Sequence, residues 1–317
     1  MNQLLPVSIL LPTRNRPDPL KRMLHSLAQQ SFQPIEMVVV DGSSTEETEQ
    51  ICRGSMAGLA TQIIYHKAIE LGAATQRNQA FAYASQPYIL FLDDDIWFEP
   101  DCLMRLWQAM QSDAKLGGVN AMITNQKYLP PGCISRLLFQ LLHGRKEESY
   151  AGKCIGPALN LLPEDRNDLP EVVPVEWLNL GCTLYRYEAL PNPPFPKHFT
   201  GYSFLEDATL SILVGKQWKL ANVRTAKIFH DSQPGDHKNN AGILSKMELV
   251  NRHYVMTHIL GRSRLKDYLN LAVLQLFGIA ALLTSVQGWR SLPAVIAGKL
   301  EGIACILSFG KETTRTE

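Results

Sequence analysis

The sequence has 317 residues, of which 45% are hydrophobic and 19% charged, and its formal net charge is +1 at pH 7. This composition supports a sizeable core and excludes a disordered chain, and the near-neutral charge gives no electrostatic basis for binding nucleic acid. Six cysteines are scattered without CxxC spacing, which favours reduced thiols in a cytosolic setting over a disulfide framework or a zinc site.

The N-terminal part of the chain alternates apolar runs with amphipathic segments. Strands are expected at residues 7–11, 36–40, 61–65 and 88–92. Helices are expected at 20–28 and at 75–84. A further helix is expected after the turn at 41–44, because Ser44 and Glu47 have the spacing of a capping box. The first apolar run lacks a preceding basic region, so it predicts a core strand and not a signal peptide. This alternation implies a mostly parallel central sheet flanked by helices, with the polar turns gathered on one edge.

Beyond residue 116 the pattern is looser. Strands are expected at 117–123, 177–186, 219–222 and 226–229, and helices at 134–142 and 206–215, the last closed by Gly215 as a C-cap. Residues 151–174 and 235–240 are expected to be loops. The chain then has a helical pattern to about residue 309. The predicted fold is therefore an α/β domain over 1–240 with a helical C-terminal appendage over 241–317.

Three consecutive carboxylates, Asp93, Asp94 and Asp95, directly follow the apolar strand at 88–92. In an open α/β sheet, ligands bind at the carboxyl ends of the strands. Carboxylate oxygens suit Mg²⁺ or Mn²⁺, whose remaining positions can be filled by phosphate oxygens. The alternative is a solvated acidic turn before a helix starting near Pro100. Together with the segments below, we favour a metal and diphosphate site.

Three polar segments follow other strands or begin helices. Residues 12–15 and 41–43 follow the first two strands, and each alone is also explained as a simple turn. Residues 72–78, GAATQRN, enter a helix whose N-terminus favours anions. Arg77 can add a bidentate phosphate contact there, although an ordinary exposed arginine is the alternative.

Two further candidates lie later in the chain. Glu206 and Asp207 begin a helix, where the helix dipole alone favours acidic residues, but one carboxylate can also act as a general base. His230 ends the apolar run AKIFH and is either a structural histidine or a metal ligand, direct or more remote.

Together these segments resemble the family 2 glycosyltransferases, which are inverting, metal-dependent enzymes with the nucleotide-diphospho-sugar transferase fold. The resemblance covers about residues 5–232. The matching segments are VSILLPTRNRPDPLKRMLHSLAQQSF, EMVVVDGSS, GAATQRNQAFAYA, ILFLDDDIWFEPDCL, WLNLGCTLYRYEAL and FTGYSFLEDATLSILVGKQWKL.

The resemblance implies a nucleotide-binding half at about 1–125, an acceptor-side half at 126–240, and a role for each candidate residue. Asp95, with His230, would hold Mn²⁺ or Mg²⁺ at the donor diphosphate, and Asp207 would be the catalytic base beside Glu206. The residues implied to bind the nucleotide and its phosphates are Pro12, Thr13, Arg14, Asp41, Arg77, Asp93 and Asp94, with Gly181 and Cys182 beside the donor sugar. The sequence departs from the family at Gly42, where a second aspartate is common, and at Arg14, where an aromatic residue is common. Both departures leave the base of the nucleotide open.

The C-terminal region has two interpretations. Residues 268–289 carry no formal charge and match the ~20 residues that cross a bilayer, but several polar residues dilute the run. We favour a membrane-seated hairpin or interfacial helix within 262–307 over a plain helical core. Its basic margins are Arg262, Arg264, Lys266, Arg290 and Lys299. The expected location is the cytoplasm, at the inner face of the membrane.

The leading functional prediction is transfer of a sugar from a nucleotide-diphosphate-sugar donor to a hydroxyl of a glycan or lipid-linked glycan. One alternative is a nucleotidyltransferase of related fold, although the sequence has no basic, Gly-rich loop near its N-terminus to hold a triphosphate. Another is a catalytically silent module that binds sugar or nucleotide, although every acidic candidate is present. The products separate the three, because the first releases a nucleoside diphosphate, the second pyrophosphate and the third neither.

Overall fold

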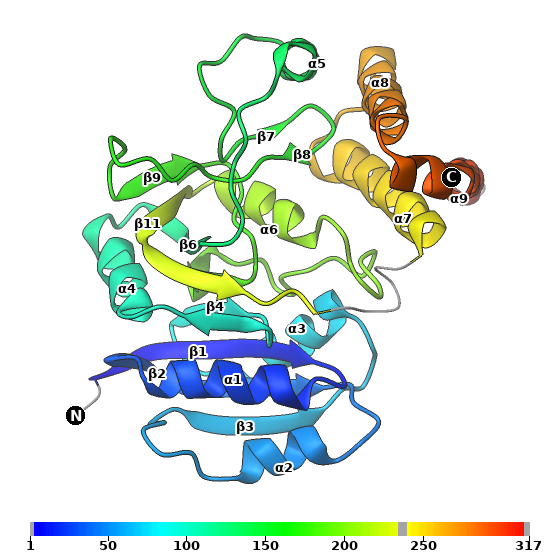
Figure 1. The fold of residues 1–317 in the computed structure, drawn as a ribbon. Coiled ribbons are helices and arrows are strands. Elements are labelled where there is room, and N and C mark those ends of the chain that lie inside the picture. Colours follow the sequence, from blue (N-terminus) through cyan, green and yellow to red (C-terminus); the bar gives the residue numbers. More distant parts are fainter. Residues whose placement is uncertain (1–2, 234–239, 314–317) are drawn as a thin grey trace. The chain divides into compact units, whose positions relative to one another are not determined.

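The computed structural model of the protein describes residues 3–233 and 240–313. Strand β1 (Gln3–Thr13) is central to a group of four parallel strands (Figure 1). It pairs with β2 (Phe32–Asp41) on one side and β4 (Tyr88–Leu92) on the other, and β2 pairs with β3 (Gln62–Lys67). Parallel strands end at the same edge of a sheet, so the polar turns that follow them gather there, as predicted.

The second half of the sheet is mixed. Strand β10 inserts antiparallel between β4 and β6, and β11 runs parallel to β6 and antiparallel to β5 and β9. The sheet order is β3-β2-β1-β4-β10-β6-β11-β5, with β9 beside β11. These strands are β5 (Ile96–Phe98), β6 (Leu116–Ile123), β9 (Val172–Val175), β10 (Cys182–Arg186) and β11 (Lys219–His230). The predicted α/β class is confirmed, and the antiparallel pairings all lie on the β10 side of β4.

Helices cover both faces of this sheet. Helices α1, α2 and α4 bury their apolar residues in one continuous core with alternate residues of the strands. Helices α3 and α6 contact the same sheet from the other face. The helices are α1 (Pro17–Ala28), α2 (Glu47–Arg53), α3 (Ala73–Phe81), α4 (Cys102–Ser112) and α6 (Glu206–Gly215), and a short 3-10 turn spans Tyr187–Ala189.

Some local predictions are wrong, each for a physical reason. The two strands expected at 219–222 and 226–229 are one strand, β11, because a register shift accommodates the polar residues between them. The expected strand at 177–186 is shorter, since Asn179 bonds locally to Gly181 and Thr183.

Two predicted helix caps are also absent. Helix α2 follows Glu46 without a side-chain cap, and the Ser44 hydroxyl donates to Asn15 Oδ1 at 3.3 Å instead of capping the helix. Gly215 is the last residue of α6 rather than its cap, and Lys216 follows it with right-handed helical dihedrals.

The chain divides into two compact units. The first is Met1–Leu129, Tyr150–Lys153 and Asn160–Gln233, and the second is Pro130–Ser149, Cys154–Leu159 and Pro234–Glu317. The second unit thus also takes residues from the middle of the chain, and the catalytic domain of 1–240 stays a prediction about function. Of the loop expected at 235–240, all but Asn240 lies outside the described residues.

The second unit is helical in its C-terminal part, as predicted. Helix α7 packs against α9 so closely that a Cβ on Gly298 would lie 2.1 Å from the carbonyl oxygen of Gly242. Glu248 on α7 accepts from Arg252 at 2.6 Å, from Lys299 on α9 at 3.1 Å and from Gln275 on α8 at 3.2 Å. The elements of this part are α5 (Cys133–His143), the short paired strands β7 (Cys154–Ile155) and β8 (Leu159–Asn160), α7 (Ala241–Tyr254), a π-helical turn at Val255–Ile259, α8 (Leu265–Leu282) and α9 (Val286–Thr313).

Candidate active site

The acidic run lies where β4 ends and the chain turns into β5. Asp94 and Asp95 are buried and Asp93 is half-buried. Strand β5 pairs with the end of β11, so that His230 lies opposite Ile96. This pairing places His230 Nε2 3.1 Å from Asp95 Oδ1. Residues 135 positions apart in the sequence are thus brought into direct contact.

Asp93, Asp95 and His230 can together hold a metal ion. Each offers one ligand atom, and these atoms lie within 4.8 Å of one another. Two carboxylate oxygens and one imidazole nitrogen suit Mn²⁺, and the carboxylates also suit Mg²⁺. His230 Nδ1 lies 3.2 Å from Gln126 Nε2, a contact that orients the ring. The residues present therefore fit the predicted divalent metal, and Asp93 joins the two ligands expected from the sequence.

Asp95 has partners on both oxygens. Its Oδ1 faces His230, and its Oδ2 accepts from the backbone N–H of Gln233 at 3.2 Å and from Arg16 at 3.2 Å. Burial would raise the pKa of Asp95, but its interactions with His230, the Gln233 N–H and Arg16 together hold that pKa below its usual range. The carboxyl is thus kept as an anion, which is the form that binds a cation.

Asp94 joins the ends of two neighbouring strands and does not face open solvent. Its Oδ2 accepts from the Thr13 hydroxyl at 2.6 Å and its Oδ1 from Arg16 at 3.1 Å. Burial raises the pKa of Asp94 to about 6, although Arg16 and Thr13 oppose the shift. Both carboxylate oxygens are thus engaged within the protein.

Arg16, which the sequence did not single out, reaches the carboxylates from the loop after β1. Asn15 has a left-handed backbone, with φ of 54°, its N–H donates to Ser43 Oγ at 2.7 Å, and its side chain accepts from Ser44. Pro17 then begins α1 with its φ preset for a helix. The loop is held at both ends, and this fixes the position of Arg16.

Arg77 is buried and links two of the candidate carboxylates. It donates to Asp93 at 2.6 Å and forms a short ion pair with Glu206. The N-terminal amides of α3 also have protein partners, because Ala73 N donates to Gly201 O at 3.0 Å. Arg77 thus positions carboxylates, instead of standing free to bind phosphate as the sequence suggested.

Gly72 makes this approach feasible. Its φ is 146°, and a Cβ there would lie 2.6 Å from Thr75 Oγ1 and 3.0 Å from Gly201 N. The close contact between the start of α3 and the loop at 201–203 therefore requires glycine.

Glu206 and Asp207 begin α6 after a strained loop. Ser203 and Leu205 have φ of 57° and 72°, a conformation that costs energy for residues other than glycine and is concentrated at functional sites. Burial raises the pKa of Glu206 to about 7, although its Arg77 partner opposes the shift. Burial also raises the pKa of half-buried Asp207 to about 6, against the Ala208 N–H, which donates at 2.6 Å, and the charge of Arg77. Glu206 is committed to Arg77, whereas Asp207 has no ion-pair partner among the described residues.

The other residues predicted to bind the nucleotide lie at the ends of β1 and β2, and their side chains differ in solvent exposure. Asp41 is fully buried and accepts from Ser43 N at 2.7 Å and from Tyr65 OH at 2.8 Å. Pro12 is half-buried and Arg14 exposed at the end of β1.

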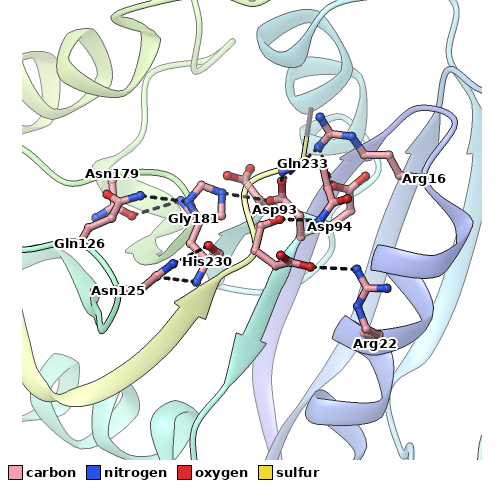
Figure 2. A network of polar contacts seen from close by, with 12 residues as sticks. Arg16, Arg22, Asp93, Asp94, Asn125, Gln126, Asn179, Gly181, His230 and Gln233 are labelled. Atoms are coloured by element: carbon pink, nitrogen blue, oxygen red, sulfur yellow. Dashed lines mark hydrogen bonds and ion pairs between the residues drawn. The ribbon is translucent and has the colours of Figure 1, made fainter. Parts of the chain in front are cut away.

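Gly181 and Cys182, which the resemblance places beside the donor sugar, have different surroundings in the structure. Gly181 is next to Asp93, whose N–H donates to its carbonyl at 3.2 Å (Figure 2). Cys182 is a free thiol on β10, and its side chain packs into the apolar core. Alternation along β10 turns its side chain inward.

The sequence missed three side chains that support the site. Arg16 lay in a segment noted only as a turn, and Gln76 lay next to Arg77 in GAATQRN. Gln76 donates to Thr13 O at 3.1 Å and Val40 O at 2.8 Å, thereby joining the ends of β1 and β2. Gln126, which contacts His230, lies 104 residues before it, and no local pattern marks that contact.

The N-terminal part of the chain is similar to known glycosyltransferase sequences. Residues 8–137 match the model of glycosyl transferase family 2. A PGL/p-HBAD biosynthesis glycosyltransferase of Mycobacterium bovis is 33% identical over 138 residues, which are 42% of this chain and 54% of that protein. The putative colanic acid biosynthesis glycosyl transferase WcaA of Escherichia coli is 37% identical over 98 residues, covering 31% of this chain and 35% of WcaA. The chain thus spans about half the length, or less, of the curated relatives that it matches.

Solved structures share the fold over nearly the whole chain. The mannosyltransferase PcManGT from Pyrobaculum calidifontis, in complex with GDP-Man and Mn²⁺, matches with a TM-score of 0.53 at 14% identity, covering 97% of this chain and 79% of that one. S. aureus TarS 1-349, in complex with UDP-GlcNAc, matches with a TM-score of 0.54 at 17% identity, covering 96% and 81%. The predicted nucleotide-diphospho-sugar transferase fold is thereby confirmed.

Proposed function

We propose that this chain, whose residues 8–137 match the model of glycosyl transferase family 2, transfers a sugar from a nucleotide-diphosphate-sugar to a hydroxyl of a glycan or lipid-linked glycan. The observation that carries the proposal is the convergence of Asp93, Asp95 and His230 within 4.8 Å at the carboxyl edge of the sheet. Arg77 links Asp93 of this cluster to Glu206, and Asp207 is the residue after Glu206 in the chain. The metal site and the candidate base are thus joined through the start of α6.

The donor site is the cluster at the end of β4. Asp93, Asp95 and His230 would hold Mn²⁺ or Mg²⁺, and such a cation stabilises negative charge on a leaving diphosphate. The matching solved structures contain GDP-Man in one case and UDP-GlcNAc in the other, which supports a nucleotide sugar without selecting its base. Pro12, Thr13, Arg14 and Asp41 remain the predicted lining of the nucleotide pocket.

Asp207 is the proposed general base. The acceptor hydroxyl oxygen attacks the anomeric carbon, the bond from that carbon to the diphosphate oxygen breaks, and the bonding electrons leave with the diphosphate. The hydroxyl proton passes to Asp207, whose raised pKa of about 6 makes it a better proton acceptor than an ordinary aspartate. Glu206 and Arg77 hold the start of α6 in place. Direct displacement inverts the anomeric carbon.

The test measures nucleoside-diphosphate release from a panel of nucleotide sugars with Mn²⁺ or Mg²⁺. The variant is Asp95→Ala, and the matched control is Asp168→Asn, an exposed carboxylate paired with Arg166. We expect release from a cognate donor, lost with a chelator and in Asp95→Ala but kept in Asp168→Asn. Release of pyrophosphate from a nucleoside triphosphate would instead indicate the nucleotidyltransferase alternative. Metal-dependent binding without release, even with acceptors supplied, would indicate a silent binding module.

We also propose that the second unit lies on an anionic membrane surface. Helices α8 and α9 each contain a stretch long and apolar enough to cross a bilayer, and only 11% of each stretch is buried. The exposed apolar residues recur at helical spacing along α8 and α9. They are Leu265, Leu269, Leu276 and Leu283, followed by Val286, Trp289, Ile296, Leu300, Ile303 and Leu307.

Helix α5 adds to this apolar surface. Ile134, Leu137 and Leu141 are exposed on one face of α5, while Leu138 and Leu142 are buried on the other. Exposed basic residues lie on or beside α5 and α8, among them Arg136, Arg145, Arg262, Arg264 and Lys266. Exposed apolar residues with basic neighbours suit a bilayer that contains anionic lipid.

The membrane proposal is tested with vesicles. We expect the protein to co-sediment with vesicles of phosphatidylglycerol and phosphatidylcholine more strongly than with phosphatidylcholine alone. Equal and negligible binding to both would contradict it. The cytoplasmic, inner-face location predicted from the sequence depends on this result.

A further inference from the structure

Arg16 lies against the acidic run on the side away from His230. Its Nη1 is 3.1 Å from Asp94 Oδ1 and 3.2 Å from Asp95 Oδ2. Figure 2 shows Arg16 and His230 on opposite sides of the aspartates. Asp95 therefore faces His230 with one oxygen and the guanidinium with the other.

The rest of the Arg16 guanidinium remains open. Its side chain is 26% exposed, whereas those of Asp94 and Asp95 are each 4% exposed. Among the described residues, only Nη1 of this group has a hydrogen-bond or ion-pair partner. Arginine presents five N–H donors in a planar fork, so donors on Nη2 and Nε can reach a ligand while Nη1 stays on the carboxylates.

Arg77 differs in this respect. Its side chain is 5% exposed, and two of its nitrogens are engaged by Asp93 and Glu206. Of these two arginines at the acidic run, Arg16 is therefore the one available to an incoming anion. The loop that carries it is already fixed by Asn15 and Ser43, which lowers the entropy lost on binding.

We propose that Arg16 binds the diphosphate of the donor and stabilises the leaving nucleoside diphosphate. The assignment rests on the proposed function, because it assumes a diphosphate beside Asp93, Asp95 and His230. Such a diphosphate lies next to the shared carboxylate of Asp95 and within reach of the open donors. When the anomeric carbon–oxygen bond breaks, negative charge grows on the diphosphate, and a fixed guanidinium interacts more strongly with the product than with the donor.

The test measures the affinity of nucleoside diphosphates by isothermal titration with Mn²⁺ present. The probes are UDP, GDP, ADP, CDP and dTDP, and for the one that binds, also its nucleoside. The variants are Arg16→Gln and Arg16→Lys, with Arg53→Gln as a charge-matched control on an exposed surface pair. We expect Arg16→Gln to weaken the diphosphate by about tenfold or more and the nucleoside hardly at all. Arg16→Lys should fall between, because it keeps the charge but loses the fork.

The other outcomes distinguish a failure of the Arg16 assignment from a failure of the proposed function. Unchanged diphosphate affinity in Arg16→Gln overturns the assignment and leaves the proposed function intact. Arg16→Gln could also bind Mn²⁺ more tightly in the absence of nucleotide while its diphosphate affinity stays unchanged. Arg16 would then only neutralise the carboxylates when no metal is bound, and the assignment would be overturned. Failure of every diphosphate to bind wild type removes both proposals. If thermal unfolding shows that Arg16→Gln does not fold, the diphosphate affinity of Arg16→Lys is the deciding measurement. Wild-type affinity in Arg16→Lys would show that the guanidinium donors are not needed to bind the diphosphate.

Discussion

The two units of this protein distribute charge in opposite ways. The first unit buries a continuous apolar core and gathers its carboxylates at the carboxyl edge of the sheet, around Asp95. In the second unit, Glu248, Arg252 and Lys299 lie in a shared network between helices, while leucines on α8 and α9 are exposed. Charge is thus concentrated at the candidate site in the first unit and between packed helices in the second. Exposed apolar residues concentrate in the second unit, and the proposed membrane contact rests on them.

Carboxylates should therefore have different roles in the two units, and Asp207→Asn should have the largest effect. Asparagine keeps the shape but cannot accept the hydroxyl proton, so we expect kcat to fall by ~10²–10⁴-fold. The affinity for nucleoside diphosphate and the thermal midpoint should change little. Turnover is measured by nucleoside-diphosphate release with acceptor present. A variant with wild-type turnover would remove Asp207 from the mechanism.

Glu248→Gln should lower stability and leave turnover unchanged. Losing the carboxylate leaves Arg252 and Lys299 without their shared anion, which we expect to destabilise the second unit by ~3 kcal/mol. Donor hydrolysis by the folded protein should be unaffected. Chemical denaturation monitors the stability, and Glu301→Gln, at an exposed pair with Lys246, is the control. Equal stability of the two variants would mean that the charge network is dispensable.

Exposed apolar residues provide the next contrast. Leu276→Asp on α8 should weaken vesicle binding by about tenfold or more without lowering stability, because the side chain is already 63% exposed. Ile69→Asp in the first unit, where the side chain is 86% exposed, is the matched control and should leave vesicle binding unchanged. Equal loss in both variants would point to a general effect of added negative charge.

The smallest expected effect is the pH dependence of turnover. The pKa of Asp207 is raised to about 6, and the base must be unprotonated to act. The rate should therefore rise with pH through about 6 and level off above it, falling by about tenfold per pH unit below. An ordinary aspartate would hold its rate down to about pH 4. A profile that stays flat well below pH 6 would show that Asp207 does not titrate as the structure indicates.

The active site was only partly predictable from the sequence. Asp93 to Asp95 were identified because an apolar strand ended in three carboxylates, and Glu206 and Asp207 because they began a helix. Arg16 and Gln126 were missed, since their roles depend on contacts 78 and 104 residues away in the chain. Arg77 was noticed for a phosphate contact, which a helix N-terminus favours. Its ion pair with Glu206 was not predicted, because Glu206 lies 129 residues away in the chain.

The sequence by itself determined the alternation of strands and helices, the parallel first half of the sheet, and the edge at which the polar turns meet. These follow from hydrophobic periodicity, which acts over a few residues. The tertiary structure decided that β10 lies antiparallel between β4 and β6, that β5 pairs with β11 and brings His230 to Asp95, and that α5 belongs with the C-terminal helices. Such pairings depend on which distant surfaces exclude water together, and that property belongs to the whole chain and to no local segment.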